Sequence, residues 1–342
     1  MTAAFVTRWG FCGTLLAGAA VTALAWCPAP LRAQSAEQEV LDVLSAVVEV
    51  RASVPASART AGSLGTERMG SGVLIDADGL IVTIGYLILE ASNVSVVTVH
   101  GDTVPASIVA YDHETGFGLL RATGALNLKP MPLGNSDRVG EWDPLLVSAF
   151  GGPRAVRPAV TVSRREFAGY WEYLLDNAIF TAPPYPMFGG AALMNSDGQL
   201  VGIGSLVVGD AVQGERTLPG NMFLPIDTLK SVMAELLTGG RASSAPRPWI
   251  GLYSNETGDG HVVVQRVAED GPASRAGIRA GDIIAQLDDR RISSLSGLYR
   301  RLWKDREPGD PVKVTVLRGT ELHEFNVTTG DRYRWLRLAP EN

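Results

Sequence analysis

The sequence predicts a mainly β protein, in which a sandwich or barrel of antiparallel sheets is followed by a smaller α+β unit. Short runs rich in Val, Ile and Leu alternate with Gly, Pro and Asp-Gly from residue 39 to residue 237, with almost no helical periodicity. After a Pro/Ser-rich stretch, strand-like and helix-like runs alternate from residue 249 to residue 330. The 342 residues suffice for two or three domains, each with a core.

The first part of the chain supplies most of the expected strands. Asp197-Gly198 marks a hairpin turn between the last two of them. One helix is expected, beginning at Asp227 as N-cap, running to Leu237 and ended by Gly239-Gly240. The strands are expected at residues 72–75, 80–83, 94–99, 108–111, 118–121, 145–149, 159–163, 178–181, 191–194 and 200–206.

Residues 241–248 (RASSAPRP) are typical of a linker and mark a domain boundary. The unit after it, residues 249–330, is expected to hold both strands and helices. The C-terminal tail, residues 331–342, is expected to be a frayed strand or a partner contact. Strands are predicted at residues 260–266, 282–287, 312–318 and 321–327, and helices at 273–276 and 295–304.

Residues 1–33 have the pattern of a cleaved signal peptide. A short basic region precedes the apolar stretch 10–26, and Ala33 is the small residue that cleavage requires. A retained membrane anchor is the alternative, but about 17 apolar residues is short for a span. Both cysteines, Cys12 and Cys27, lie in this segment, so the processed chain would lack thiols and disulfides. We therefore expect an exported, periplasmic protein.

Charge and composition exclude several classes of function. The formal net charge of −6 offers no basic footprint for nucleic acid. None of the four histidines has the spacing of a metal-ligand pair. We expect no nucleic-acid partner, no metal and no cofactor.

Four stretches follow one another along the chain: residues 70–83 (GSGVLIDADGLIVT), 134–153 (GNSDRVGEWDPLLVSAFGGP), 189–203 (GGAALMNSDGQLVGI) and 221–241 (NMFLPIDTLKSVMAELLTGGR). In this order they resemble the trypsin-like core of the HtrA/Deg family of exported serine proteases. The later string GPASRAGIRAGD, which follows WIGLY, is similar to the PDZ domain of that family. The resemblance implies a trypsin-like double β-barrel at residues 34–240 and an α+β PDZ domain at residues 249–330.

The catalytic triad of such proteases is missing from the matching strings. Tyr86 stands where the family has its histidine base, and Gly116 where it has the orienting aspartate. Phe188 stands in place of the serine nucleophile. A hydroxyl needs an adjacent base to attack, and that base needs an orienting acid. The triad positions therefore predict a catalytically degenerate member, a pseudoprotease.

A further substitution affects the oxyanion hole. The first glycine of the nucleophile motif donates a backbone N–H in the family, and Pro186 replaces it here without an N–H. Losing one such donor typically costs about 2.7–4 kcal/mol of transition-state stabilisation. Replacement groups are not evident in the sequence: His113 is expected to be a solvated turn residue, and neither Lys129 nor Lys230 is attractive for a Ser/Lys dyad.

The PDZ resemblance implies a peptide site made of backbone groups. The amides of Ile250, Gly251 and Leu252 would receive a peptide C-terminus, and the peptide would add a strand beside residues 252–254. Leu298 and Leu302, four apart on a predicted helix, could line the pocket for the terminal side chain. Alternatively, these two leucines simply fill the core.

Three functions remain open at this stage. The preferred one is an exported pseudoprotease that binds polypeptide C-termini or unfolded segments, in a chaperone-like or regulatory role that could include co-assembly with an active HtrA-type protease. The second is an active trypsin-like serine endopeptidase. The third is a structural assembly protein. The resemblance also makes a homotrimer plausible.

Overall fold

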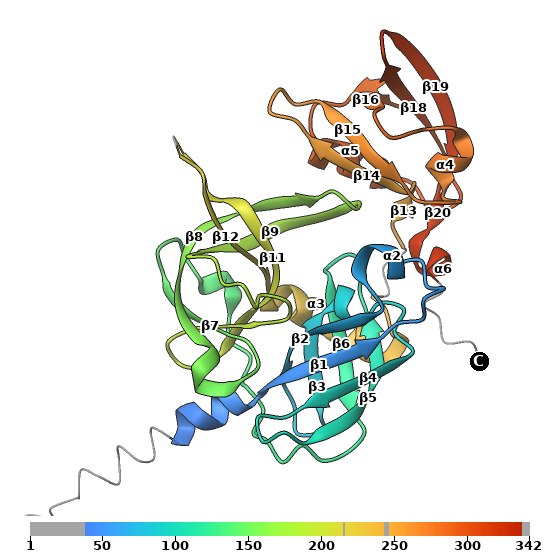
Figure 1. Cartoon of the computed structure of the whole chain (residues 1–342). Helices are drawn as coiled ribbons and strands as arrows, with labels where there is room; N and C mark the ends of the chain where they lie inside the picture. Colours follow the sequence, from blue (N-terminus) through green and yellow to red (C-terminus); the bar gives the residue numbers. More distant parts are fainter. Residues whose placement is uncertain (1–37, 215, 243–245, 337–342) are drawn as a thin grey trace, which may run out of the picture. The chain divides into compact units, whose positions relative to one another are not determined.

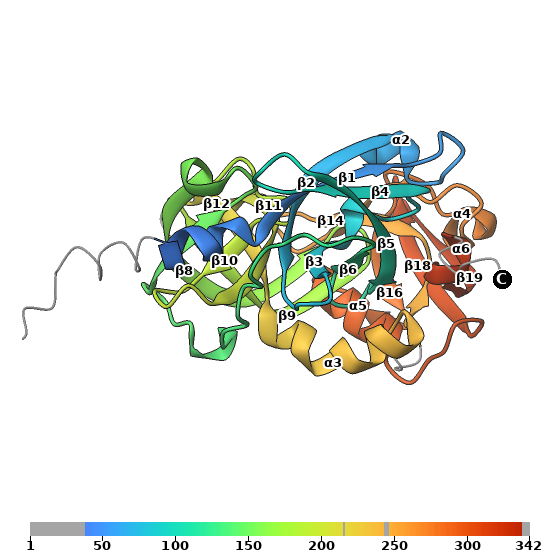
Figure 2. The same ribbon diagram turned by 90° about the horizontal axis from the view of Figure 1, so that it is seen from below.

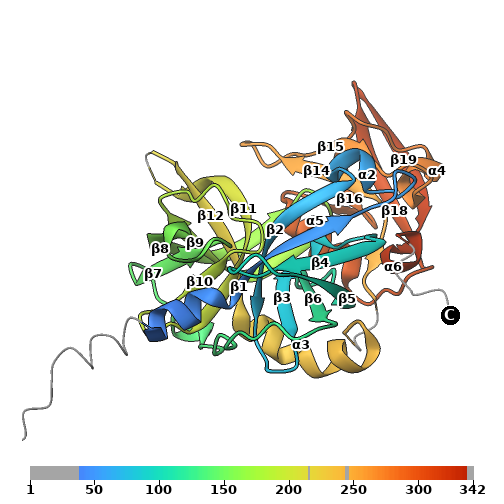
Figure 3. The same cartoon turned by 60° about the horizontal axis from the view of Figure 1, so that its bottom comes forward.

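The computed structural model describes residues 38–214, 216–242 and 246–336, and the expected signal peptide lies outside them. The strands between Val47 and Ala122 close an antiparallel barrel in the order β1-β2-β3-β6-β5-β4 (Figure 1, Figure 3). Its strands are β1 (Val47–Ser53), β2 (Glu67–Leu74), β3 (Leu80–Ile84), β4 (Asn93–Val97), β5 (Thr103–Tyr111) and β6 (Phe117–Ala122). Short helical turns, α2 (Ala61–Leu64) and η1 (Gly85–Leu87), lie in the connections.

A second closed barrel follows, in the order β10-β11-β12-β9-β8-β7. The turns η2 (Ser136–Arg138) and η3 (Gly152–Ala155) flank its first strand. The strands are β7 (Pro144–Ser148), β8 (Val156–Gly169), β9 (Tyr173–Ala182), β10 (Ala192–Met194), β11 (Leu200–Val212) and β12 (Leu218–Pro225). The mainly β fold class and the trypsin-like double barrel are confirmed.

Two barrel strands were missed by the sequence prediction, and each has a local reason. In β1, Glu49 and Arg51 interrupt the apolar run, although Glu49 is only 7% exposed because it pairs with Arg51. In β12, Pro219 and Gly220 read as loop residues. Tertiary pairing overrides both signals, since each of these strands pairs with a neighbour on both sides.

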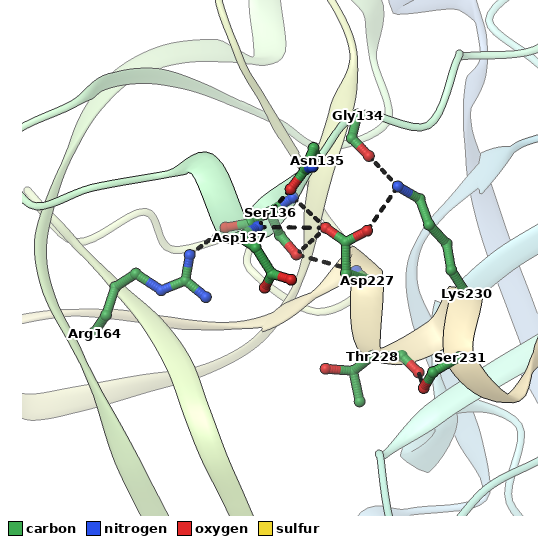
Figure 4. A network of polar contacts seen from close by, with 9 residues as sticks. All are labelled: Gly134, Asn135, Ser136, Asp137, Arg164, Asp227, Thr228, Lys230 and Ser231. Carbon is green, nitrogen blue, oxygen red and sulfur yellow. Dashed lines mark hydrogen bonds and ion pairs between the residues drawn. The ribbon is translucent and has the colours of Figure 1, made fainter.

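The helix α3 (Ile226–Gly239) follows the second barrel and is labelled in Figure 2. The residue at its N-cap position is Pro225, so the expected Asp227 cap is wrong. Asp227 lies in the first turn, where its carboxylate accepts hydrogen bonds from the Ser136 backbone and hydroxyl (Figure 4). Lys230 donates to Asp227 and to the Gly134 carbonyl. The carboxylate therefore ties the helix to a loop about 90 residues earlier, and Gly240 ends the helix in a left-handed conformation.

The C-terminal part is a PDZ-like α+β unit with the main strand order β14-β15-β16-β18-β19. Its second helix begins at Ser294, whose side chain accepts the Gly297 N–H as an N-cap. The elements are β14 (Leu252–Glu256), β15 (Val262–Val267), α4 (Pro272–Ala276), β16 (Ile283–Leu287), β17 (Arg290–Arg291), α5 (Leu295–Trp303), β18 (Pro311–Arg318) and β19 (Glu321–Thr328). Because β14 is the first strand of this order, one of its edges is free of the sheet.

The described part of the tail is ordered, contrary to the expectation of a frayed strand. β20 (Gly330–Asp331) pairs with β13 (Pro248–Trp249), and α6 (Arg332–Trp335) follows. The Tyr333 hydroxyl donates to Asp112 Oδ1 at 3.1 Å. The tail therefore packs against a turn of the first barrel within the same chain. No helix among the residues described has the length and apolar character of a membrane span.

Candidate functional site

Backbone contacts bring the degenerate triad positions together where the barrels meet. The Gly85 N–H donates to the Gly116 carbonyl at 2.8 Å, which places the acid position beside the turn that carries Tyr86. The Ser71 N–H donates to the Gly189 carbonyl at 2.8 Å. A Cβ built on Gly189, the residue after Phe188, would lie 3.1 Å from the Tyr86 hydroxyl oxygen.

Tyr86, which stands at the position of the histidine base, makes a hydrogen bond to the protein backbone. Its hydroxyl donates to the Ser205 carbonyl of β11 at 3.0 Å. Burial raises the pKa of Tyr86 well above the usual value of a phenol, so the side chain stays protonated. A neutral phenol that already donates its proton to a carbonyl is a poor general base at neutral pH.

The backbone at Gly116 does not suit an aspartate. Its φ is +85°, in a region that favours glycine, and a Cβ there would lie 3.2 Å from the Tyr173 hydroxyl oxygen. That hydroxyl donates to the Thr115 carbonyl at 2.8 Å. An aspartate at this position would adopt an unfavourable backbone conformation and would crowd the Tyr173 hydroxyl.

The loop that carries Phe188 is held by hydrogen bonds, but the residue at the nucleophile position has no nucleophilic atom. Tyr185 anchors its start: the backbone N–H donates to Asn221 Oδ1 at 2.6 Å, and the hydroxyl donates to the Ala155 carbonyl at 2.7 Å. Pro186 is exposed and Phe188 is half-buried. The Phe188 carbonyl accepts the Ala191 N–H at 3.0 Å. The loop is held on both sides of a residue that cannot act as a nucleophile.

The expectation for His113 is wrong, because this residue is buried. Its ring lies between Tyr111 and Tyr333 with centroid separations of 4.4 and 4.5 Å, and neither ring nitrogen has a hydrogen-bond partner. Burial, reinforced by the charge of Arg332, holds the pKa of His113 well below its ordinary value. The neighbouring Asp112 carboxylate accepts hydrogen bonds from Thr115 and Tyr333, and the Tyr86 hydroxyl bonds to Ser205 and to neither Asp112 nor His113.

The backbone loop predicted to bind a peptide C-terminus already holds a carboxylate. The Ile250 N–H donates to Glu172 Oε2 at 3.1 Å, and the Leu252 N–H donates to Oε1 at 2.7 Å. Gly251 lies between these donors, and its carbonyl accepts the Ala268 N–H at 2.8 Å. Glu172 comes from the short turn between β8 and β9 of the second barrel. The predicted amides therefore converge on one carboxylate, which belongs to the chain itself.

Burial raises the pKa of Glu172 to about 7. The hydrogen bonds from Leu252, Ile250 and Gly251 and the charge of Arg332 oppose this effect but do not cancel it. The backbone donors and Arg332 therefore offset only part of the cost of burying this carboxylate.

Comparison with known proteins agrees with both parts of the fold. Residues 70–203 match the model of the trypsin-like peptidase domain, and residues 248–329 match that of the PDZ domain. The probable periplasmic serine endoprotease DegP-like of Halomonas elongata is 29% identical over 282 residues, 77% of this chain and 56% of the relative. The serine endoprotease DegS of Haemophilus influenzae is 28% identical over 286 residues, 80% of this chain and 81% of the relative.

The chain joins a trypsin-like peptidase domain to a PDZ domain and is similar to DegP-like and DegS serine endoproteases. A solved structure of the serine endoprotease from Yersinia pestis superposes with a TM-score of 0.50 at 26% identity, covering 86% of this chain and 97% of that one. The HtrA-like chain spans between half and two thirds of the length of the first curated relatives that it matches.

Leu298 and Leu302 lie in the core of the PDZ unit of this HtrA-like chain, 1% and 0% exposed. Leu174 of β9 belongs to the same apolar cluster. The neighbouring residue on α5, Tyr299, donates its hydroxyl to the Gly169 carbonyl at 2.7 Å and accepts the Glu172 N–H at 3.1 Å. The core-filling interpretation of the two leucines fits these positions, and their contact with a peptide side chain stays a prediction.

Sequence reasoning missed Glu172 and Tyr299. Glu172 sits in an unremarkable hairpin turn, and its partners lie 78 and 80 residues further along the chain. One local signal was available: Trp171 and two tyrosines crowd this turn, which is unusual for a turn fully exposed to solvent. Within the described ranges, no cluster of three His, Cys, Asp or Glu side chains is arranged to hold a metal ion.

Proposed function

We propose that this HtrA-like chain is an exported pseudoprotease, which binds polypeptides and does not cleave them. The observation that carries the proposal is the hydrogen bond from Tyr86 to the Ser205 carbonyl. It commits the residue at the base position to a structural contact, beside Gly116 and the loop of Phe188. A serine-type mechanism needs a nucleophile, a base and an orienting acid, and the matching positions supply none of them.

Polypeptide binding is assigned to the PDZ unit, because a backbone carboxylate site is the feature that peptide-binding PDZ domains use. The ligands would be C-termini or unfolded segments of exported proteins, and the role chaperone-like or regulatory, including co-assembly with an active HtrA-type protease. A homotrimer and a periplasmic location belong to the same proposal. The location draws on the name of the Halomonas elongata relative, which describes that protein as periplasmic.

Proteolysis is tested with the purified protein and fluorescein-labelled casein, followed by fluorescence release and gel electrophoresis. A Phe188→Ala variant, prepared in parallel, reports contaminating protease, because it changes the nucleophile position without supplying a hydroxyl. We expect equal, background-level cleavage by both proteins. A fluorophosphonate probe, which labels activated serines, is expected to leave the protein unlabelled.

Cleavage by the wild type that disappears in Phe188→Ala would contradict the proposal and reveal an unrecognised catalytic arrangement in the cleft. The same cleavage in both proteins would point to a contaminant, which the fluorophosphonate probe identifies by the mass of the labelled band. Binding is tested separately through the capacity of the protein to suppress aggregation of heat-treated citrate synthase. Suppression at stoichiometric amounts is expected, and its absence counts against a chaperone-like role.

A further inference from the structure

The turn between β8 and β9 follows the free edge of the PDZ strand β14. Along this edge the N–H groups of Ile250, Leu252 and Ser254 point to the same side, as alternate residues of an extended chain do. The first two donate to the Glu172 carboxylate, and the Ser254 N–H donates to the Tyr170 carbonyl at 2.9 Å. A short segment of the second barrel thus satisfies successive donors of this edge.

The same segment is held from the opposite side by α5. Tyr299 bonds with both ends of the turn, through the Gly169 carbonyl and the Glu172 N–H. The Tyr299 side chain is 1% exposed, so these bonds are shielded from water. Leu174, the second residue of β9, is 7% exposed and lies within the apolar cluster of the PDZ unit.

The C-terminal helix α6 also contacts the turn. Arg332 of α6 donates to the Trp171 carbonyl at 3.0 Å. Glu172 has a φ of +57°, a left-handed conformation that costs a non-glycine residue some energy and that persists because its surroundings hold it. Its side chain is nevertheless placed with both carboxylate oxygens on backbone donors.

These contacts reproduce each part of peptide recognition by strand addition. A ligand of this kind places a terminal carboxylate on the loop amides, main-chain groups on the edge strand and a side chain in an apolar pocket. The turn offers the Glu172 carboxylate to the loop amides, the Tyr170 carbonyl to the Ser254 N–H and the Leu174 side chain to the apolar cluster of the PDZ unit.

Resting on the proposed peptide-binding function, we infer that residues 169–174 are a resident internal ligand of the PDZ groove, which incoming carboxylate-ended peptides must displace. The groove is free only in the fraction of molecules in which the turn is released, and the apparent dissociation constant rises in inverse proportion to that fraction. Peptide capture is therefore coupled to movement of a hairpin that belongs to the protease-type barrel.

The test compares wild type with Glu172→Ala, Glu172→Gln and a matched control, Glu141→Gln. Glu141 is an exposed glutamate of the second-barrel segment, so this control removes a carboxylate without touching the groove. The probe is a mixture of fluorescein-labelled octapeptides with three randomised C-terminal residues and a free carboxylate, and the same mixture with C-terminal amides. Binding is followed by fluorescence anisotropy.

We expect Glu172→Ala to bind the carboxylate mixture at least tenfold more tightly than wild type and the control, because it removes the acceptor oxygens from the Ile250 and Leu252 amides. Glu172→Gln, which keeps a neutral acceptor in the same place, is expected to stay within threefold of wild type, and no protein is expected to bind the amide mixture comparably. Equal affinity of wild type and Glu172→Ala would overturn the inference. Should Glu172→Ala fail to give a cooperative unfolding transition, Tyr299→Phe serves instead, because it removes both hydroxyl contacts with the turn and keeps the ring.

Amide hydrogen exchange at Ile250 and Leu252 separates this inference from the proposed function. Exchange at least tenfold faster in Glu172→Ala than in wild type supports the resident-ligand contact whether or not a peptide binds. Unchanged exchange contradicts it. If exchange accelerates and no variant binds the carboxylate mixture, the peptide-binding function fails while the internal contact stands.

Discussion

The triad region where the barrels meet (the cleft: Tyr86, Gly116 and Phe188) and the edge of the PDZ unit at Ile250–Ser254 (the groove) both make contacts within the chain, but in different ways. In the cleft, Tyr86 and Phe188 are substitutions at the reacting positions, and Tyr86 is fixed by its bond to Ser205. In the groove, the backbone donors are intact and a separate segment covers them through Glu172. Under the proposed function, the cleft has lost its catalytic groups, whereas the groove keeps its backbone donors behind a contact that a peptide can displace.

The largest expected effect is the loss of stability when a side chain is added at Gly190, in the loop that follows Phe188. An alanine at Gly190 would place its Cβ 1.9 Å from the Ser71 carbonyl oxygen and 2.8 Å from Thr83 Oγ1, at a φ of +75°. Because the obstructing carbonyl is backbone and cannot rotate away, Gly190→Ala is expected to lower the free energy of unfolding by about 3–4 kcal/mol. Urea denaturation followed by circular dichroism measures it.

The control for Gly190→Ala is Gly258→Ala, since no atom lies within 4 Å of a Cβ built there. It should change the free energy of unfolding by less than about 0.5 kcal/mol. If Gly190→Ala changes the free energy of unfolding as little as Gly258→Ala does, the loop around Gly190 can adjust to a side chain. The cleft would then not be more rigid than the groove.

The second effect is the pH dependence of the groove contact. The pKa of Glu172 is raised by burial from its ordinary value of 4.5 to about 7, so the folded state holds this proton more tightly than the unfolded state. The stabilisation from this proton is full below pH 4.5 and is lost as the pH rises through 7. Wild type should lose about 2–3 kcal/mol relative to Glu172→Gln between pH 5 and pH 8.

This pH effect is measured as the difference in free energy of unfolding between the two proteins at each pH. The groups that face Glu172 are Tyr299 from α5 and Arg332 from α6, together with the loop amides. Burial raises the pKa of Tyr299 further above its usual value, so it does not titrate in this window. The buried His113 is common to both proteins and cancels in the difference. A difference that is flat with pH would show that Glu172 is not desolvated in solution.

The smallest effect is expected at the rim of the groove contact. Arg300 of α5 pairs with Glu166 of β8 and Asp176 of β9, but its own side chain is 55% exposed. Exposed ion pairs contribute about 0.2–1 kcal/mol, so Arg300→Gln should change stability by no more than that and leave octapeptide affinity within threefold of wild type. A tenfold gain in octapeptide affinity for Arg300→Gln would instead show that the surface ion pairs of Arg300 are the main contacts that keep the turn in the groove.

Much of the fold could be predicted because local patterns agree with it. The hairpin turn at Asp197-Gly198 is confirmed, with Asn195 Oδ1 accepting the N–H groups of Asp197 and Gln199. The predicted helix over residues 295–304 appears as α5 (Leu295–Trp303), because Ser294 caps it and its apolar face is buried. The strands that were missed, β1 and β12, carry charges or Pro and Gly that only sheet pairing explains.

By itself, the sequence determined the mainly β architecture, the two kinds of domain and the residues at the triad positions. Those are properties of local pattern and residue identity, since a side chain without a nucleophilic atom cannot attack wherever it lies. Only the tertiary structure decided that His113 is buried and that Glu172 occupies the PDZ loop. The physical reason is that burial and hydrogen-bond pairing depend on which distant segments meet, and Glu172 meets its donors across 78 and 80 residues of chain.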